Sequence, residues 1–382
     1  LEYVRRWTVD ALMQLSLMVV QPLYATVYLP SWLRLMGARI GARAEISTVD
    51  HISADLLEVG EESFIADSVS VGPAAVRHGE LFVGRTSVGR RSFIGNSAVL
   101  PAGTRVGTDC LIGVMSLPPA GASEEQLSDS TWLGSPAMYL PRRQDSGSFD
   151  DAQTFAPPAR LVLLRGLVEL FKIILPYALT SSVFVVAYAL LSTAGAGLDA
   201  VTFALLGPLV MLACGLVVGA VTVAAKWIIV GRYGETRKPL WDHFVWRSEL
   251  INSLCENAVY PLLLRQLVGT PMLPAFFRLL GSKLGRGVYM DTTEVTEFDL
   301  VEVGDDACLN NGCTVQTHLF EDRVMKMSSL RIGDGCSVGP MAVVLYDSEM
   351  KQRSHLEGLS LLMKGETLPA GTHWQGAPAS AK

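Results

Sequence analysis

Four consecutive six-residue units in residues 88–111 decide the fold of this chain. They read Val88-Gly-Arg-Arg-Ser-Phe, Ile94-Gly-Asn-Ser-Ala-Val, Leu100-Pro-Ala-Gly-Thr-Arg and Val106-Gly-Thr-Asp-Cys-Leu. Each begins with an aliphatic residue, most continue with glycine, and the fifth place holds a small residue. Neither the two-residue period of a strand nor the 3.6-residue period of an amphipathic helix fits this pattern. It predicts a triangular coil in which one aliphatic side chain per face points inward and glycine relieves the tight corner.

The coil pattern occurs twice because the chain contains an internal duplication. Leu35-Met-Gly-Ala-Arg-Ile-Gly41 matches Leu279-Leu-Gly-Ser-Lys-Leu-Gly285 at an offset of 244 residues, and 55–60 matches 299–304 at the same offset. The second copy has hexads of its own, such as Ile332-Gly-Asp-Gly-Cys-Ser. The small fifth place is occupied in three hexads by a cysteine, which we interpret as a packing residue, with a reactive thiol as the alternative: Cys110, Cys313 and Cys336.

Two uncharged stretches, 173–191 and 200–225, contain 19 and 26 residues. Each is long enough to cross a hydrocarbon core about 30 Å thick, and the short segment between them predicts a helical hairpin. Lys and Arg flank the hairpin on its outer ends and are absent from its connecting loop. The positive-inside rule therefore places both coils in the cytoplasm of a multi-pass protein of the cell membrane. A further uncharged stretch, 11–29, is interrupted by Pro22, and we interpret it as a membrane-surface helix.

The composition narrows the functional classes. Charged residues make up 18% of the 382 residues and mean hydropathy is +0.33, which argues against disorder and against a wholly soluble protein. The net charge of −6 gives no reason to expect a nucleic-acid partner. Six cysteines without paired spacing argue against a disulfide framework or a zinc site. The chain opens at Leu1 without a signal-peptide pattern, so we interpret it as part of something longer.

The hexads, closed by Gly134-Ser-Pro-Ala137 and Gly376-Ala-Pro-Ala379, resemble the left-handed parallel β-helix of hexapeptide-repeat acyltransferases. Tandem copies, a membrane hairpin and Gln316-Thr-His-Leu-Phe-Glu-Asp-Arg323 more narrowly resemble the C-terminal region of membrane-bound nonribosomal peptide synthetases of the polylysine-synthetase type. The resemblance implies a mainly β fold with two left-handed β-helix domains linked by a two-helix transmembrane hairpin. The expected parts are a helical segment at 1–33, a first β-helix at 34–145, a linker at 146–160, membrane helices at 161–231, amphipathic helices at 232–280 and a second β-helix at 281–382.

The same resemblance implies transfer of an aminoacyl or peptidyl group from a carrier-domain thioester to an amine. It also implies upstream adenylation and carrier domains, a lipid bilayer and an oligomer or pseudo-trimer of coils as partners. The donor is then a phosphopantetheine thioester, and no cofactor is expected to bind tightly. Two alternatives remain: an acyl-CoA-dependent acetyl- or acyltransferase, and a non-catalytic scaffold that docks the carrier.

Hexapeptide-repeat acyltransferases resemble one another in using a histidine as general base, a role suited to a group titrating near neutrality. His318 lies where the second set of hexads is interrupted, on an expected loop, and is the first candidate. Glu321 or Asp322 is expected to orient its imidazole or to hold an acceptor ammonium. Arg323 is expected to bind a carboxylate or a carrier phosphate. Asn310 and Asn311 complete the candidate substrate-binding residues.

Copy one offers weaker candidates. His78 lies in the equivalent interruption, but its neighbours do not repeat the second-copy pattern, and His51 follows Asp50, a candidate orienter. A further histidine, His355, falls in 346–362, which we expect to leave the coil as a long excursion. The histidine and cysteine spacing does not suggest a metal site.

Overall fold

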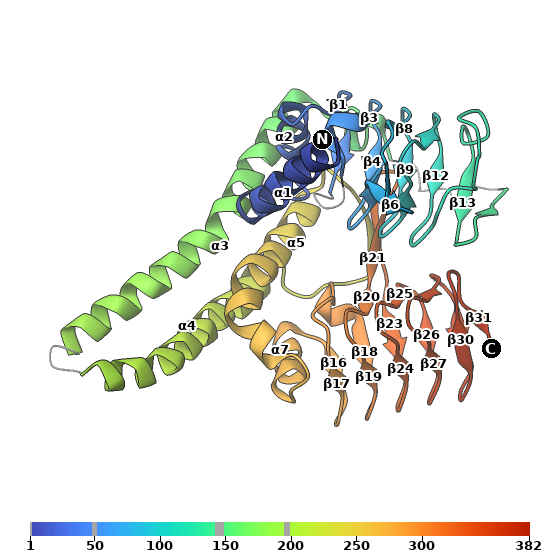
Figure 1. Ribbon diagram of the computed structural model, residues 1–382. Helices are drawn as coiled ribbons and strands as arrows, with labels where there is room; N and C mark the ends of the chain where they lie inside the picture. Colours follow the sequence, from blue (N-terminus) through green and yellow to red (C-terminus); the bar gives the residue numbers. More distant parts are fainter. Residues whose placement is uncertain (1, 48–51, 142–148, 195–198) are drawn as a thin grey trace. The chain divides into compact units, whose positions relative to one another are not determined.

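The computed structural model describes residues 2–47, 52–141, 149–194 and 199–382. The chain forms two compact units. The first comprises Leu1–Gly166 together with Pro239–Trp241 and Phe320–Val324. The second comprises Leu167–Lys238, Asp242–Leu319 and Met325–Lys382. Each unit contains one of the two predicted coils, whose strands stack as successive rungs (Figure 1).

The first coil has three faces of short parallel strands, and the chain visits them in rotation. The first face contains β1 (Arg39–Ile40), β3 (Leu57–Val59), β8 (Thr86–Val88) and β11 (Arg105–Val106). The second contains β2 (Glu45–Ile46), β4 (Phe64–Ile65), β9 (Phe93–Ile94), β12 (Leu111–Ile112) and β13 (Thr131–Leu133), closed by the antiparallel β14 (Met138–Tyr139). The third contains β5 (Ser70–Val71) and β10 (Val99–Leu100). A hairpin of β6 (Ala75–Arg77) and β7 (Glu80–Phe82) interrupts this coil, and a 3₁₀ turn, η2 (Ala54–Leu56), precedes β3.

The glycine in the second place of a hexad was expected to relieve a tight corner, but the structure requires it for a different reason. A Cβ at Gly89 would lie 2.3 Å from the carbonyl oxygen of Gly107, so successive rungs approach too closely there for any side chain. The left-handed corner falls two residues later, at Arg91 (φ 55°) and at Ser97 (φ 56°). The fifth-place prediction is confirmed, because Cys110 and its counterparts are fully buried.

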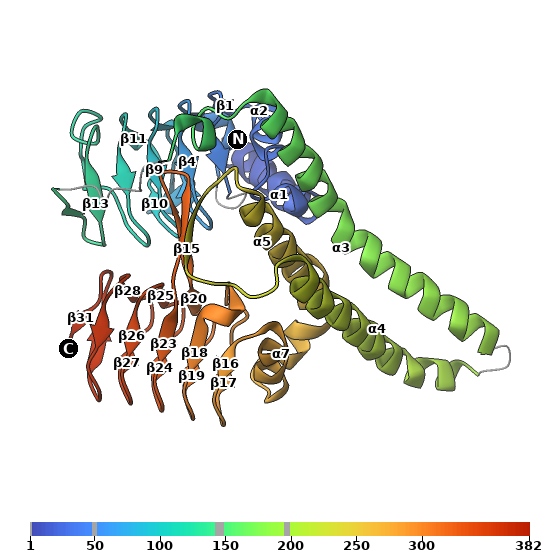
Figure 2. The same cartoon turned by 180° about the vertical axis from the view of Figure 1, so that it is seen from behind.

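The second coil repeats this plan with more regular rungs. Its first face contains β16 (Lys283–Leu284), β18 (Val301–Val303), β23 (Leu330–Ile332), β26 (Glu349–Met350) and β29 (Thr367–Leu368). The second contains β17 (Tyr289–Met290), β19 (Cys308–Leu309), β24 (Ser337–Val338), β27 (His355–Leu356), β30 (His373–Gln375) and the antiparallel β31 (Ser380–Ala381). The third contains β20 (Thr314–Gln316), β25 (Val343–Leu345) and β28 (Leu361–Leu362), labelled in Figure 2. The excursion expected at 346–362 is wrong, because these residues form ordinary rungs.

Both coils are thus three-sided parallel β-helices by strand order and register, and their left hand stays a prediction. The inward position of each rung is filled by an aliphatic side chain such as Ile94, Leu100, Leu309 or Val338, each fully buried. One fully buried aliphatic side chain contributes roughly 1.5–3 kcal/mol relative to an exposed one. The stacked inward residues therefore supply the core that each coil needs.

Two long helices follow the first coil: α3 (Ala159–Ala194) and α4 (Ala200–Ile229). By length and composition, each is apolar enough to cross a membrane. Pro176 and Pro208 lie inside them, as is tolerated in membrane helices. The predicted uncharged stretches fall within these two helices.

A strand, β15 (Thr236–Pro239), and a run of helices lead from α4 to the second coil. The helices are α5 (His243–Leu254), the π-helix η4 (Cys255–Leu264), α6 (Arg265–Leu267) and α7 (Met272–Leu280). The π-helix packs closely on α4, where a Cβ at Gly215 would lie 2.9 Å from the Leu262 carbonyl oxygen. Glycine on α4 therefore allows the two backbones to approach.

The N-terminal part of the first unit is helical, as expected. It contains α1 (Glu2–Val20), a 3₁₀ turn, η1 (Gln21–Leu23), and α2 (Leu29–Leu35). Trp7 on α1 is 62% exposed, and Leu12 is 59% exposed. A further 3₁₀ turn, η3 (Asp151–Gln153), lies in the expected linker.

Candidate active site

The second coil is interrupted after the third-face strand β20, where the chain leaves as a hairpin. The hairpin consists of β21 (His318–Glu321) and β22 (Val324–Met327), and β23 resumes the coil. His318 is therefore the first residue of a strand at the base of this hairpin. The expected surface loop is wrong here, because the segment pairs as strands and His318 is only 9% exposed.

His318 is held by a carboxylate that lies upstream in the coil. Its Nδ1 lies 2.6 Å from Oε2 of Glu297, whose side chain is fully buried. Glu297 has φ 36° and ψ 65°, in the left-handed region, immediately before the 3₁₀ turn η5 (Phe298–Leu300). Glu297 shares this left-handed backbone with corner residues of the coils such as Arg91 and Ser97. A buried carboxylate that fixes a histidine through Nδ1 is the arrangement that orients a general base.

Hydroxyl groups surround the Glu297 carboxylate. Thr317 Oγ1 lies 2.7 Å from Glu297 Oε2, and Ser248 Oγ lies 3.4 Å from Oε1. Tyr233 OH lies 3.2 Å from Ser248 Oγ and extends the network to the segment after α4. Burial alone would raise the pKa of Glu297, but the charge of His318 and the surrounding hydrogen bonds outweigh it and lower that pKa. Glu297 is therefore ionised at neutral pH.

A small cavity of about 120 Å³ lies beside this network in the second unit. Thr296 lines it, and the hydroxyl oxygens of Thr296 and Thr317 are 3.1 Å apart. Cys255 also lines the cavity, but burial raises the pKa of its thiol to about 12, so the thiol stays protonated at neutral pH. Among the residues that the structure describes, no group of three or more His, Cys, Asp or Glu could hold a metal ion.

Copy one differs at the two positions aligned with the histidine–glutamate pair. Ile52-Ser-Ala54 precedes its aligned aspartate, and Gly72-Pro-Ala74 follows its third-face strand, so neither an acid nor a histidine stands in these places. His78 is exposed at the tip of the β6–β7 hairpin with φ 52°. His51 and Asp50 lie outside the described residues. The roles of His78 and His51 stay predictions.

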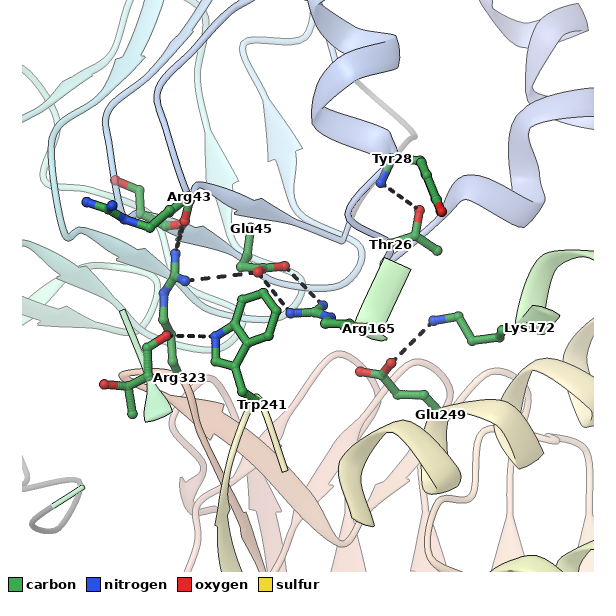
Figure 3. Close-up of polar contacts among 11 residues, drawn as sticks. Thr26, Tyr28, Arg43, Glu45, Arg165, Lys172, Trp241, Glu249 and Arg323 are labelled. Atoms are coloured by element: carbon green, nitrogen blue, oxygen red, sulfur yellow. Dashed lines mark hydrogen bonds and ion pairs between the residues drawn. The ribbon is translucent and has the colours of Figure 1, made fainter. Parts of the chain in front are cut away.

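Arg323 is buried among polar groups of the first unit. It belongs to the first unit, is fully buried, and donates from Nη2 to the backbone carbonyl oxygens of Arg43 and Ser63. Its Nη1 lies 4.0 Å from Glu45 Oε1, and Arg165 binds the same carboxylate through two ion-paired contacts (Figure 3). Burial lowers the pKa of Arg323 to about 10, so the guanidinium is still charged at neutral pH. Arg323 is thus enclosed by groups of the first unit, and its expected binding of a carboxylate or a carrier phosphate stays a prediction.

The other sequence candidates are placed more simply. Asn310 Nδ2 donates to the Val338 carbonyl oxygen at 2.7 Å and so links two rungs, while Asn311 is exposed at the following corner. Glu321 ends β21 and Asp322 is in the turn of the hairpin with φ 49°, and both are half-buried. The carboxylate at His318 Nδ1 is that of Glu297. Substrate contacts of Asn310, Asn311, Glu321 and Asp322 stay predictions.

The network residues Glu297, Ser248 and Tyr233 were not among the residues predicted from sequence. Glu297 is 21 residues before its histidine, and Ser248 lies on α5, so local spacing cannot join them. One signal was available: between the copies, an acid stands two residues before Asp299, and a serine stands two residues before Asp55. The copies therefore differ at this position, and that difference can be read from the sequence.

Comparison with known proteins gives one strong match. The chain is 40% identical, over 99% of its length, to the delta-poly-L-ornithine synthetase of Acinetobacter baumannii (strain AB307-0294). The chain is a relative of this poly(amino acid) synthetase. The resemblance stated from the hexads and the membrane hairpin is thereby confirmed. The chain spans 28% of the length of that synthetase.

Two solved structures illustrate the matches to parts of the chain. A maltose O-acetyltransferase from Clostridium difficile 630 is 13% identical, over 41% of this chain and 95% of its own, with a TM-score of 0.26. A serine acetyltransferase from Neisseria gonorrhoeae, in complex with serine, is 13% identical, over 58% and 75%, with a TM-score of 0.27. At such low scores the architecture rests on the strand pairing described above. No protein-family model matches the chain.

Proposed function

We propose that this chain is the amide-forming part of a membrane-bound nonribosomal peptide synthetase, and that it transfers an aminoacyl or peptidyl group from a carrier-domain thioester to an amine. The observation that carries the proposal is the buried pair of His318 and Glu297 at the base of the second-coil hairpin. The relation to a poly-L-ornithine synthetase supports the amino-acid class of substrate. Upstream adenylation and carrier domains, and an oligomer or pseudo-trimer of coils, are part of the proposal.

In the proposed step, His318 acts as the base. The acceptor ammonium gives a proton to His318 Nε2, and the free amine attacks the thioester carbonyl carbon. His318 releases this first proton to solvent. As the new C–N bond forms and the C–S bond breaks, the attacking nitrogen gives up a second proton, which His318 carries to the departing thiolate, so the products are an amide, a thiol and one released proton. Ionised Glu297 stabilises the imidazolium that forms between these events.

The donor separates this proposal from its alternatives. We expect purified full-length synthetase to form amide from an aminoacyl-loaded carrier in a single turnover, and acetyl-CoA to give no transfer above background. Transfer from acetyl-CoA to an amino acid, without transfer from the carrier, would instead favour an acyl-CoA-dependent acyltransferase. Product formation that is unchanged when the His318 side chain is removed would favour the scaffold.

We further propose that α3 and α4 cross the cell membrane and that both coils lie on the cytoplasmic side. A cysteine introduced at Ser192, in the last turn of α3, should react with an impermeant maleimide added outside intact cells. A cysteine at Lys351, on the second coil, should react only after lysis. The parent chain is the control for labelling of the native cysteines. Labelling in the opposite order would place the coils outside.

A further inference from the structure

A large groove runs along the first face of the first coil. Its volume is about 1100 Å³, and its charged lining consists of Arg34, Arg39, Arg85 and Arg105 against Glu58 and Glu124. The corresponding face of the second coil has a groove of about 670 Å³, lined by Lys283, Arg331 and Lys351 against Glu302, Asp334 and Glu349. Copy one therefore has two positive charges in excess, and copy two is balanced.

Strand register explains the difference. On the second coil, Lys283 faces Glu302, Glu302 faces Arg331, and Arg331 faces Glu349, so the signs alternate from rung to rung. On the first coil, Arg39 faces Glu58, but the next rungs contribute Ser87 and then Arg105. Where copy two has glutamate, copy one has arginine. Alternating signs neutralise each other across a sheet, whereas the copy-one ladder ends on a cation.

The arginines of the groove differ in the ion pairs and hydrogen bonds that they form within the chain. Arg39 lies 2.7 Å from Glu58, and Arg85 lies 3.9 Å from the same carboxylate and is 68% exposed. Arg34 donates to the Ile40 and Gly41 carbonyl oxygens, which fixes its guanidinium at the rim. Arg105 is exposed and forms no ion pair within the part of the chain that the structure describes. Glu58 is thus shared by Arg39 and Arg85, and the guanidinium of Arg105 can donate hydrogen bonds to a ligand.

We propose that this groove binds the phosphate of a phosphopantetheine donor. The guanidinium fork matches phosphate oxygens with two parallel hydrogen bonds, which lysine cannot provide, and the charged lining of this groove has arginine as its sole cation. The inference rests on the proposed function, since it names what recognises the donor of that reaction. The same phosphate occurs on a carrier domain and in coenzyme A.

The test is a charge reversal at the position where the copies differ. We measure binding of 4′-phosphopantetheine, coenzyme A and phosphopantetheinylated carrier to full-length synthetase by titration calorimetry. Arg105→Glu, which restores the copy-two sign, and Arg85→Glu should each raise Kd roughly tenfold or more, an effect of about 1.4 kcal/mol. Lys351→Glu, in the balanced groove, is the matched control and should bind as the parent does. Parent affinity should fall as salt is raised from low ionic strength to 0.5 M, because exposed charges are screened.

The outcomes separate this inference from the proposed function. Weakened binding of the carrier alone assigns the groove to carrier-borne phosphate, and weakened binding of all three ligands assigns it to either source. Equal affinities of Arg105→Glu and parent for all three ligands overturn the inference. His318→Ala should bind every ligand normally. If His318→Ala still transfers while Arg105→Glu loses binding, the groove stands and the proposed base fails.

Discussion

Replacing His318 with alanine should lower amide formation by the full-length synthetase roughly 10²–10⁴-fold, the usual contribution of a positioned base. The cause is that an ammonium cannot attack a thioester until it has lost a proton, and His318 is the histidine held by a buried carboxylate. Adenylation of the amino acid, monitored by pyrophosphate exchange, should run at the parent rate. Amide formation is measured in a single turnover from preloaded carrier.

Alanine variants of two other histidines are the controls for this loss of rate. His355 is on the outside of the same coil, 5.4 Å from His373 between ring centroids, and His355→Ala should polymerise as the parent does. His78→Ala should be milder than His318→Ala, because its side chain is at an exposed hairpin tip. If His318→Ala polymerises at the parent rate, the base lies elsewhere, and His51 and His78 of copy one become the leading candidates.

Glu297→Gln should give a smaller loss than His318→Ala. The amide preserves the shape of the side chain but removes the negative charge that favours the protonated imidazole. We therefore expect the acidic limb of the rate–pH profile to move to lower pH. A loss of rate without any movement of that limb would mean that Glu297 acts through the fold and not through His318.

The largest expected effect on stability comes from Glu45→Ala in the first unit. Glu45 accepts both Arg165 contacts, at 3.0 and 3.2 Å, and lies 4.0 Å from Arg323. Arg165 is 2% exposed, and Arg323 is fully buried. Removing the carboxylate takes a counter-ion away from two buried cations, and breaking a buried ion pair typically costs about 3–5 kcal/mol. Trp241, whose ring lies 4.6 Å from the Arg165 guanidinium carbon, stacks on the cation but cannot replace the charge.

This loss of unfolding free energy is measured as the shift in the urea midpoint of the purified chain, with unfolding of the first unit monitored by its susceptibility to proteolysis. Glu58→Ala is the matched control, because its partner Arg39 is 72% exposed and such surface pairs contribute about 0–1 kcal/mol. A loss below about 1 kcal/mol in Glu45→Ala, within the range of surface pairs, would show that other contacts already compensate the buried cations, such as the Arg43 and Ser63 carbonyls at Arg323.

The periodic parts of this protein could be predicted from sequence. A hexad places one side chain inward per rung, so the period alone sets which residues are buried, and uncharged length alone marks α3 and α4. The duplication could also be predicted, because it is a constant offset in the text of the chain. His318 was found for the same reason, since it stands where a regular pattern stops.

Only the tertiary structure decided how the polar residues are used. Glu297 and His318 are neighbours because a rung of the coil returns the chain to the same face after some twenty residues, and Ser248 joins them from a helix. Arg323 was expected from sequence to bind a ligand, and the tertiary structure buries it beside Glu45. Local spacing predicts a periodic core because its neighbours are set by the period. The partner of a buried charge is set by the tertiary fold, and its distance along the sequence follows no repeat.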